Sequence, residues 1–97
     1  AEARNRAASR LKPLGLSLNA QVPGSLLRKE LRINSVSTKS LDDALQRGRI
    51  SMRGYDKCLR LAWTNADLGG RIEPNSGDVA KALWLRGVAS QLTLSHG

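Results

Sequence analysis

Apolar residues recur every three or four positions along most of the chain, which is the spacing of one face of an α-helix. β-branched residues are few, and no stretch alternates apolar and polar residues over the length of a strand. The pattern therefore predicts an all-α fold, a small bundle of about five helices. Because no repeat or low-complexity linker divides the chain, residues 1–97 are expected to form a single domain.

The first predicted helix covers residues 2–12 and ends at Pro13 and Gly15. It begins without a capping residue, so we expect the chain to be part of a longer polypeptide. Pro23 is suited to the first turn of a second, short helix, where a missing N–H costs nothing. The apolar positions of that helix are Leu26, Leu27 and Leu31.

A third helix follows, and either Ser37 or Ser40 could cap it. Ser40 with Asp43 three positions later resembles a capping box. The apolar face of this helix consists of Leu41, Ala44 and Leu45, and Gly48 ends it.

The longest predicted helix begins after a Ser51 cap and runs to about Leu68, before Gly69 and Gly70. One stripe of this helix is mostly apolar and is expected to pack: Tyr55, Leu59, Ala62, Trp63 and Ala66. A second stripe is expected to meet water or a partner: Arg53, Lys57, Arg60, Thr64 and Asp67.

The last predicted helix begins near residues 74–76, and residues 89–97 are expected to form a flexible tail. Its helical face carries Val79, Ala82, Leu83 and Arg86.

The net charge of the chain limits the classes of partner that it is expected to bind. Sixteen Lys and Arg residues against eight Asp and Glu residues give a net charge of +8, which favours polyanions such as nucleic acid or nucleotide phosphates. No apolar run approaches the roughly 18 residues of a membrane span, and the N-terminus lacks a signal-peptide pattern, so a cytoplasmic protein without a membrane partner is expected.

Catalysis by this chain alone is not expected. Its 97 residues are far fewer than the roughly 200 that an ATPase with its own nucleotide site needs. The phosphate loop GxxxxGK[ST] is absent, and Cys58, His96 and the scattered Asp residues form neither a catalytic set nor a metal site.

Arg53 is the sharpest candidate for a functional residue. It follows the Ser51 cap at the start of the longest helix, where free backbone N–H groups and the helix dipole favour an anion. A guanidinium adds a forked, permanently charged donor there. The alternative is that Arg53 is an ordinary solvated residue.

Other candidates have competing structural explanations. Arg60 lies on the face of Arg53, but Asp56 four positions before it could form an intrahelical pair. Trp63 and Trp84 could stack on a base, although packing in the core is favoured for both, as it is for Cys58. Six basic residues could bind nucleic acid or could only solubilise the surface: Arg4, Arg6, Arg10, Arg28, Lys29 and Arg32.

Residues 50–68, ISMRGYDKCLRLAWTNADL, closely resemble the C-terminal motif of the magnesium-chelatase-like AAA+ ATPases of the ComM/YifB type. In that family a Leu-Ser-x-Arg-(Gly/Ala)-Tyr opening precedes Arg-x-Ala-x-Thr-x-Ala-Asp-Leu. The matching positions here are Ile50, Ser51, Arg53, Gly54, Tyr55, Arg60, Ala62, Thr64, Ala66, Asp67 and Leu68.

Three further segments are similar to the same family: AEARNRAASR at the start, NAQVPGSLLRKELR, and DVAKALWLRG near the end. The resemblance thus covers almost the whole chain. Ile50 replaces the usual Leu, and the loop GGRIEPNSGD differs from the commoner form, which leaves the docking of the last helix less defined.

The resemblance implies a helical lid that covers ATP bound by a preceding core, with magnesium-chelatase subunits among its relatives. It implies that Arg53 is the sensor 2 arginine, which reaches the γ-phosphate, and that Arg60 and Lys57 support nucleotide binding or a subunit interface. ATP and Mg²⁺ would belong to the parent protein and not to this chain. The implied partners are the chain's own N-terminal core, neighbouring subunits of an expected hexameric ring, and DNA that the parent remodels in branch migration and recombination.

Two alternatives belong to other classes of protein. A stand-alone basic helical module would bind DNA or RNA by itself, with an affinity that falls steeply with salt. A purely structural oligomerisation domain would leave the ATPase rate of the parent unchanged when Arg53 is replaced.

Overall fold

The structure is a computed structural model that describes the backbone of residues 2–16 and 18–96 and the side chains of residues 5–16, 18–19 and 21–86. Helices account for all regular structure in these residues, so the predicted all-α fold is confirmed. The elements are α1 (Glu2–Leu11), the 3₁₀ turns η1 (Lys12–Leu14) and η2 (Asn19–Gln21), α2 (Gly24–Leu27), α3 (Lys39–Gln46), α4 (Met52–Leu68) and α5 (Ser76–His96).

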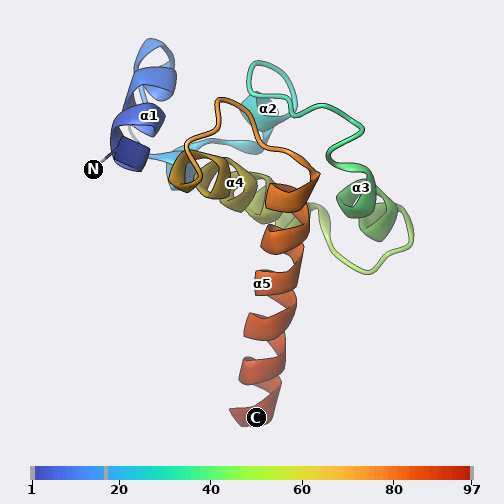
Figure 1. The fold of residues 1–97 in the computed structure, drawn as a ribbon. Helices are drawn as coiled ribbons and strands as arrows, with labels where there is room; N and C mark the ends of the chain where they lie inside the picture. Colours follow the sequence, from blue (N-terminus) through green and yellow to red (C-terminus); the bar gives the residue numbers. More distant parts are fainter. Residues whose placement is uncertain (1, 17, 97) are drawn as a thin grey trace.

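Helix α4 is the centre of the fold, and α1, η2, α2, α3 and α5 all contact it (Figure 1). The first turns of α5 pack against α4, and the rest of α5 projects away from the body. The apolar stripe of α4 is buried as predicted at Leu59, Ala62, Trp63 and Ala66, while Tyr55 is half-buried. Buried residues from the other elements close the core around it: Leu11, Val22, Leu27, Leu31, Ile33, Leu41, Val79 and Ala82.

Trp63 is the largest side chain of this core. Its Nε1 donates a hydrogen bond to the carbonyl oxygen of Leu31 at 3.2 Å. A buried indole N–H needs an acceptor, and here the acceptor also fixes the loop after α2. The predicted packing role of Trp63 is therefore confirmed.

An ion pair joins α1 to the far end of α4. Arg10 Nη1 and Nη2 donate to the two carboxylate oxygens of Asp67 at 2.8 and 2.7 Å, and the Arg10 guanidinium lies 4.3 Å from the centre of the Trp63 ring. Asn19 donates a further bond to Asp67 at 2.9 Å. The prediction that Asp67 meets water or a partner is wrong, because Arg10, 57 positions earlier, covers it.

The start of α5 is fixed by reciprocal bonds between Asn75 and Asp78. The Asp78 N–H donates to Asn75 Oδ1 at 2.9 Å, and the Asn75 N–H donates to Asp78 Oδ2 at 3.0 Å. Arg71 adds an ion pair to the same carboxylate. Burial raises the pKa of Asp78, but the bonds from Arg71 and Asn75 and the nearby positive charges outweigh burial, so the pKa lies below its usual value.

We expect Asp78 to contribute to the acid sensitivity of the fold. A carboxyl whose pKa is depressed by folding stabilises the protein above its unfolded pKa of about 3.9, and that contribution is lost as the pH falls through the lower folded value. Urea unfolding followed by circular dichroism should therefore show a smaller loss of stability between about pH 5 and 3 in Asp78→Asn than in the unchanged chain. Asp43→Asn is the control, because Asp43 makes no ion pair with a described residue. An unchanged pH slope in Asp78→Asn would contradict the prediction.

Two helix boundaries differ from the sequence predictions. Pro23 precedes α2 as its N-cap, and α2 ends at Leu27, so Leu31 enters the core from a turn. The residue before α3 is Thr38, whose hydroxyl donates to Asp42 at 2.9 Å; neither Ser37 nor Ser40 caps this helix.

The last helix is longer than predicted. The backbone of α5 is helical as far as His96 and passes through most of the segment 89–97, for which a flexible tail is predicted. Side chains from residue 87 onward lie outside the described residues, and flexibility of this segment stays a prediction.

Candidate functional site

The first turn of α4 holds Arg53 at the protein surface. Ser51 has an extended backbone, and its Oγ accepts a hydrogen bond from the Gly54 N–H at 3.1 Å, which confirms the predicted cap. The Arg53 side chain is exposed and makes no hydrogen bond or ion pair with any described residue. Because the N–H groups of the first turn lack intrahelical acceptors, Arg53 and the helix end together offer donors to an anion.

A second guanidinium lies beside this turn. Gly54 is buried, and a Cβ placed on it would lie 2.8 Å from Nη2 and 2.9 Å from Nε of Arg86 on α5. No described residue forms an ion pair with Arg86. A cation next to a helix N-terminus is electrostatically unfavourable without an anion, so Arg86 strengthens the positive potential around Arg53.

Ser51 fixes where α4 begins and therefore where Arg53 points. Replacing an N-cap serine by alanine leaves a first-turn N–H without its acceptor. We expect Ser51→Ala to lower the free energy of unfolding by about 1 kcal/mol, measured by urea unfolding of the chain. Ser40→Ala is the matched control, since Ser40 is exposed inside α3 and caps nothing. Equal losses in the two variants would argue against the cap.

Lys57 and Arg60 continue the face of α4 that carries Arg53. They line a shallow cavity of about 380 Å³ together with Leu61 and Thr64. Lys57 is exposed, and no described residue pairs with it. Arg53 is not among the lining residues, so the three cations share a helix face without forming one pocket.

Arg60 is held within the fold. Its Nε donates to the carbonyl oxygen of Val22 at 2.7 Å, which ties α4 to the segment between η2 and α2. The predicted alternative, a pair with Asp56, is wrong because Asp56 accepts from Arg28 Nη1 at 2.9 and 3.2 Å. Because this hydrogen bond joins two segments, the main role of Arg60 in the described structure is to hold α4 in position.

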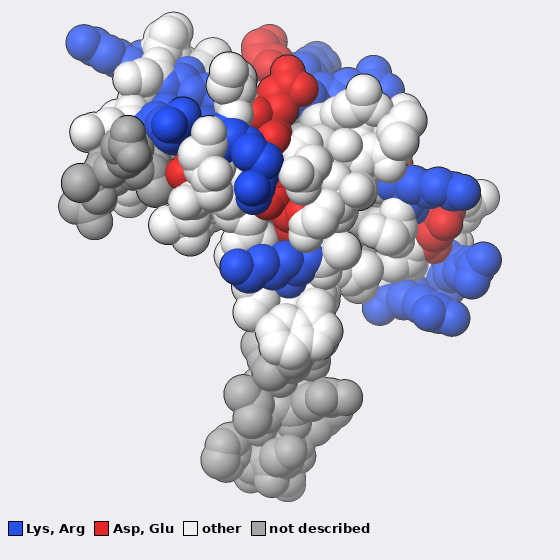
Figure 2. All heavy atoms as spheres, in the orientation of Figure 1, with Lys and Arg blue, Asp and Glu red and all other residues white. Residues whose placement is uncertain are grey.

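The six basic residues considered for nucleic-acid binding do not share one role. Arg10 is paired with Asp67, and Arg28 with Asp56. Lys29 and Arg32 are exposed, Arg6 is half-buried, and the side chain of Arg4 lies outside the described residues. Figure 2 shows the Lys and Arg side chains spread over several elements on the face in view.

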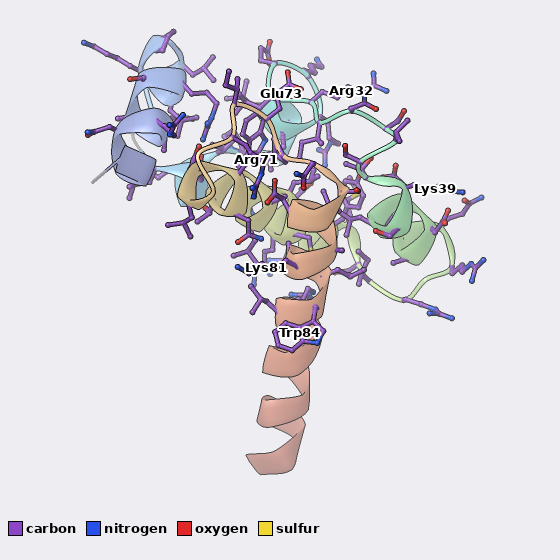
Figure 3. The ribbon with its side chains drawn as sticks, viewed as in Figure 1. Arg32, Lys39, Arg71, Glu73, Lys81 and Trp84 are labelled. Carbon is purple, nitrogen blue, oxygen red and sulfur yellow. The ribbon has the colours of Figure 1, made fainter. Side chains whose placement is uncertain are left out.

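The remaining candidates divide between core and surface. Cys58 is fully buried, which confirms the predicted packing role, and burial raises the pKa of its thiol although the charge of Arg86 opposes this. Trp84 is 64% exposed on α5, so its predicted core packing is wrong (Figure 3). The helical face of α5 buries Val79 and Ala82, and Trp84 lies off that face.

Two kinds of feature are missing from the described part of the chain. No three His, Cys, Asp or Glu side chains come close enough there to hold a metal ion. The described helices also include none with both the length and the apolar character of a membrane span.

Arg86 is the residue of this site that the sequence prediction left unassigned. The pattern places it on the packing face of the last helix, but only the contact with α4 shows which turn it meets. Two signals in the sequence point to such a contact. An arginine occupies a position that otherwise belongs to the apolar face, and a glycine stands in the first turn of the longest helix, where its missing side chain leaves room.

Comparison with known proteins finds similarity over most of the chain. The family described as "magnesium chelatase, subunit ChlI C-terminal" matches residues 1–86. Proteins of Mycobacterium tuberculosis and Mycobacterium bovis, each described as an uncharacterized protein, are 48% identical to this chain over 84 residues.

That similarity covers 87% of this chain but only 17% of the length of each mycobacterial relative. The chain thus corresponds to a minor part of those proteins. No solved structure matches it significantly.

Proposed function

This chain belongs to the family of magnesium chelatase subunit ChlI C-terminal domains, and we propose that it is the helical lid of a ComM-type AAA+ ATPase, with Arg53 as its sensor 2 arginine. In this role the lid covers ATP bound by a core that precedes it. Arg53 then reaches the γ-phosphate in the assembled ring and stabilises the charge that develops there during hydrolysis.

The observation that supports this role most directly is the state of Arg53. It is exposed at a capped helix N-terminus, and no described carboxylate occupies its guanidinium. By contrast, Arg10, Arg28 and Arg71 each pair with an aspartate of this chain. An arginine kept free at an anion-favouring helix end is suited to a phosphate from another domain.

Lys57 and Arg60 have supporting roles in this proposal. Lys57, one turn after Arg53 and also exposed, can meet the nucleotide or a neighbouring subunit. Arg60 anchors α4 to the carbonyl of Val22, which holds the face of Arg53 and Lys57 in place. The cavity beside them, lined partly by Leu61, gives that face an apolar contact area for a subunit interface.

For the intact protein we propose a ring of ATPase subunits, a hexamer by family resemblance, that uses ATP and Mg²⁺ and remodels DNA. The phosphate loop and Mg²⁺ ligands would then lie in the preceding core. The ComM-like spacing of residues 50–68 supports a DNA motor over a tetrapyrrole-metallating enzyme. A stand-alone nucleic-acid-binding module is less well supported, because two of the six basic residues considered for it are engaged in ion pairs.

The experiment that tests this proposal is ATP hydrolysis by the intact protein with and without Arg53→Ala, with circular dichroism as the check that the helices remain. A hydrolysis rate that does not depend on Arg53 would favour a purely structural domain.

A further inference from the structure

A cavity of about 640 Å³ lies between α1 and the loop that joins α4 to α5. Three arginines line it together with Asn5, Ser9 and Ile72: Arg6, Arg10 and Arg71. The cavity adjoins the C-terminal end of α4, where Asp67 pairs with Arg10. Asp67 and Arg53 are 14 residues apart, or about 21 Å along the helix axis, so this cavity is distinct from the surroundings of Arg53.

The charges around the cavity do not cancel. Both oxygens of Asp67 are bound by Arg10, and both oxygens of Asp78 are bound by Arg71. Arg6 has no such partner among the described residues. Three arginines and two aspartates therefore leave one positive charge, located on Arg6.

The hydrogen bonding is incomplete in the same place. The Nε atoms of Arg6 and Arg10 are both buried and have no acceptor. A buried N–H without an acceptor has lost its hydration and gained nothing in exchange. An anion bound in the cavity would form charge-assisted bonds with the guanidinium groups that line it.

The backbone allows Arg6 to cross to the loop. Gly70 has a φ of +74°, and a Cβ placed on it would still lie 3.8 Å from Arg6 Nη2. The Arg6 guanidinium thus ends beside the loop that carries Arg71, and some of the Lys and Arg atoms in Figure 2 lie between α1 and that loop. Figure 3 shows Glu73 farther along the loop, and Glu73 is not among the lining residues.

From these observations we propose that the cavity between α1 and the α4–α5 loop binds a phosphate group, with Arg6 as its principal ligand and Arg10 and Arg71 as supporting cations. Phosphate is favoured because its oxygens match the forked donors of several guanidinium groups at once. Ser9 and Asn5 add neutral donors at the same wall. The cavity is larger than an inorganic anion, so the phosphate can belong to a nucleotide or to a nucleic-acid backbone.

The test uses the ¹⁵N-labelled chain, titrated with inorganic phosphate at constant ionic strength and followed by NMR. Backbone amides of α1 and of residues 70–72 should shift, and Arg6→Gln should weaken the apparent affinity about tenfold. Arg49→Gln is the control, because it removes the same charge from an exposed position outside the cavity. It should change the affinity less than twofold.

Arg6→Lys provides a second variant that keeps the charge and loses the fork, and it should bind phosphate with an intermediate affinity. Equal affinities in Arg6→Gln and Arg49→Gln, or no shifts in α1, would overturn the proposal. Titrations with ATP and with a short DNA duplex then identify the source of the phosphate. The source is the ligand whose affinity falls when Arg6 is replaced. None of these measurements involves ATP hydrolysis or Arg53, so the result is independent of the proposed lid function.

Discussion

ATP hydrolysis by the intact protein should fall by about 100-fold when Arg53 is replaced by alanine, the size of effect seen when one preorganised transition-state donor is removed. The physical reason is that charge on the transferring phosphoryl group is stabilised by donors already in place. Arg53 makes no bond with the described part of this chain that would have to break first. Because the interaction strengthens in the transition state, kcat should fall more than the affinity for ATP.

Two further variants make this result specific to Arg53. Arg47→Ala removes the same charge from an exposed residue at the end of α3 and should leave hydrolysis nearly unchanged. Arg53→Lys keeps the charge but not the fork, so it should recover only part of the lost rate. Circular dichroism should show intact helices in all three variants. If Arg53→Ala hydrolyses ATP at the normal rate while folded, Arg53 is not at the nucleotide.

The longest helix is the element that the sequence predicts best, because its signals are local. A serine cap, an apolar stripe of helical period and two glycines at the end define α4 within one residue of its observed bounds. The position of Arg53 follows from the same cap. The residue on which the proposed function depends is therefore positioned by local sequence signals, without any tertiary contact.

The predictions that were wrong concern contacts between distant segments. Asp67 belongs to a polar stripe by periodicity, yet it is buried because Arg10 reaches it from α1. Trp84 is apolar enough for a core, yet α5 projects from the body and leaves it exposed. On an isolated helix Arg60 would face Asp56, but in the fold Asp56 accepts hydrogen bonds from Arg28, which follows α2. The spacing of residues along one helix does not determine which side chains from distant segments will contact it.

The same limit applies to the short elements. Helix α2 has four residues, too few for hydrophobic periodicity to mark its end, and the turn after it delivers Leu31 to the core. For α3, three neighbouring hydroxyl residues compete as caps, and Thr38 occupies the cap position although its side chain bonds Asp42 and not a backbone N–H of the first turn. Such choices depend on differences of about 1 kcal/mol, which packing against α4 and α5 can outweigh.

Asp67→Ala should lower the free energy of unfolding by about 3 kcal/mol, the cost of breaking a buried ion pair by removing one partner. The Asp67 side chain is 3% exposed and that of Arg10 is 17% exposed, so water replaces the lost carboxylate poorly. The substitution also removes the acceptor of Asn19. Asp67 belongs to the family motif. If the loss is this large, the role of Asp67 is structural, because it holds α1 against α4.

The matched control is Asp56→Ala, which breaks the more exposed pair with Arg28, whose side chain is 44% exposed against 16% for that of Asp56. Surface pairs of this kind contribute about 0 to 1 kcal/mol, so urea unfolding should separate the two variants clearly. Arg10→Ala, alone and combined with Asp67→Ala, completes a double-mutant cycle that isolates the pair from the loss of packing on Trp63. If Asp67→Ala costs no more than Asp56→Ala, the pair does not hold α1. The position of Asp67 in the motif would then need a functional explanation, such as a contact with the ATPase core or with a neighbouring subunit.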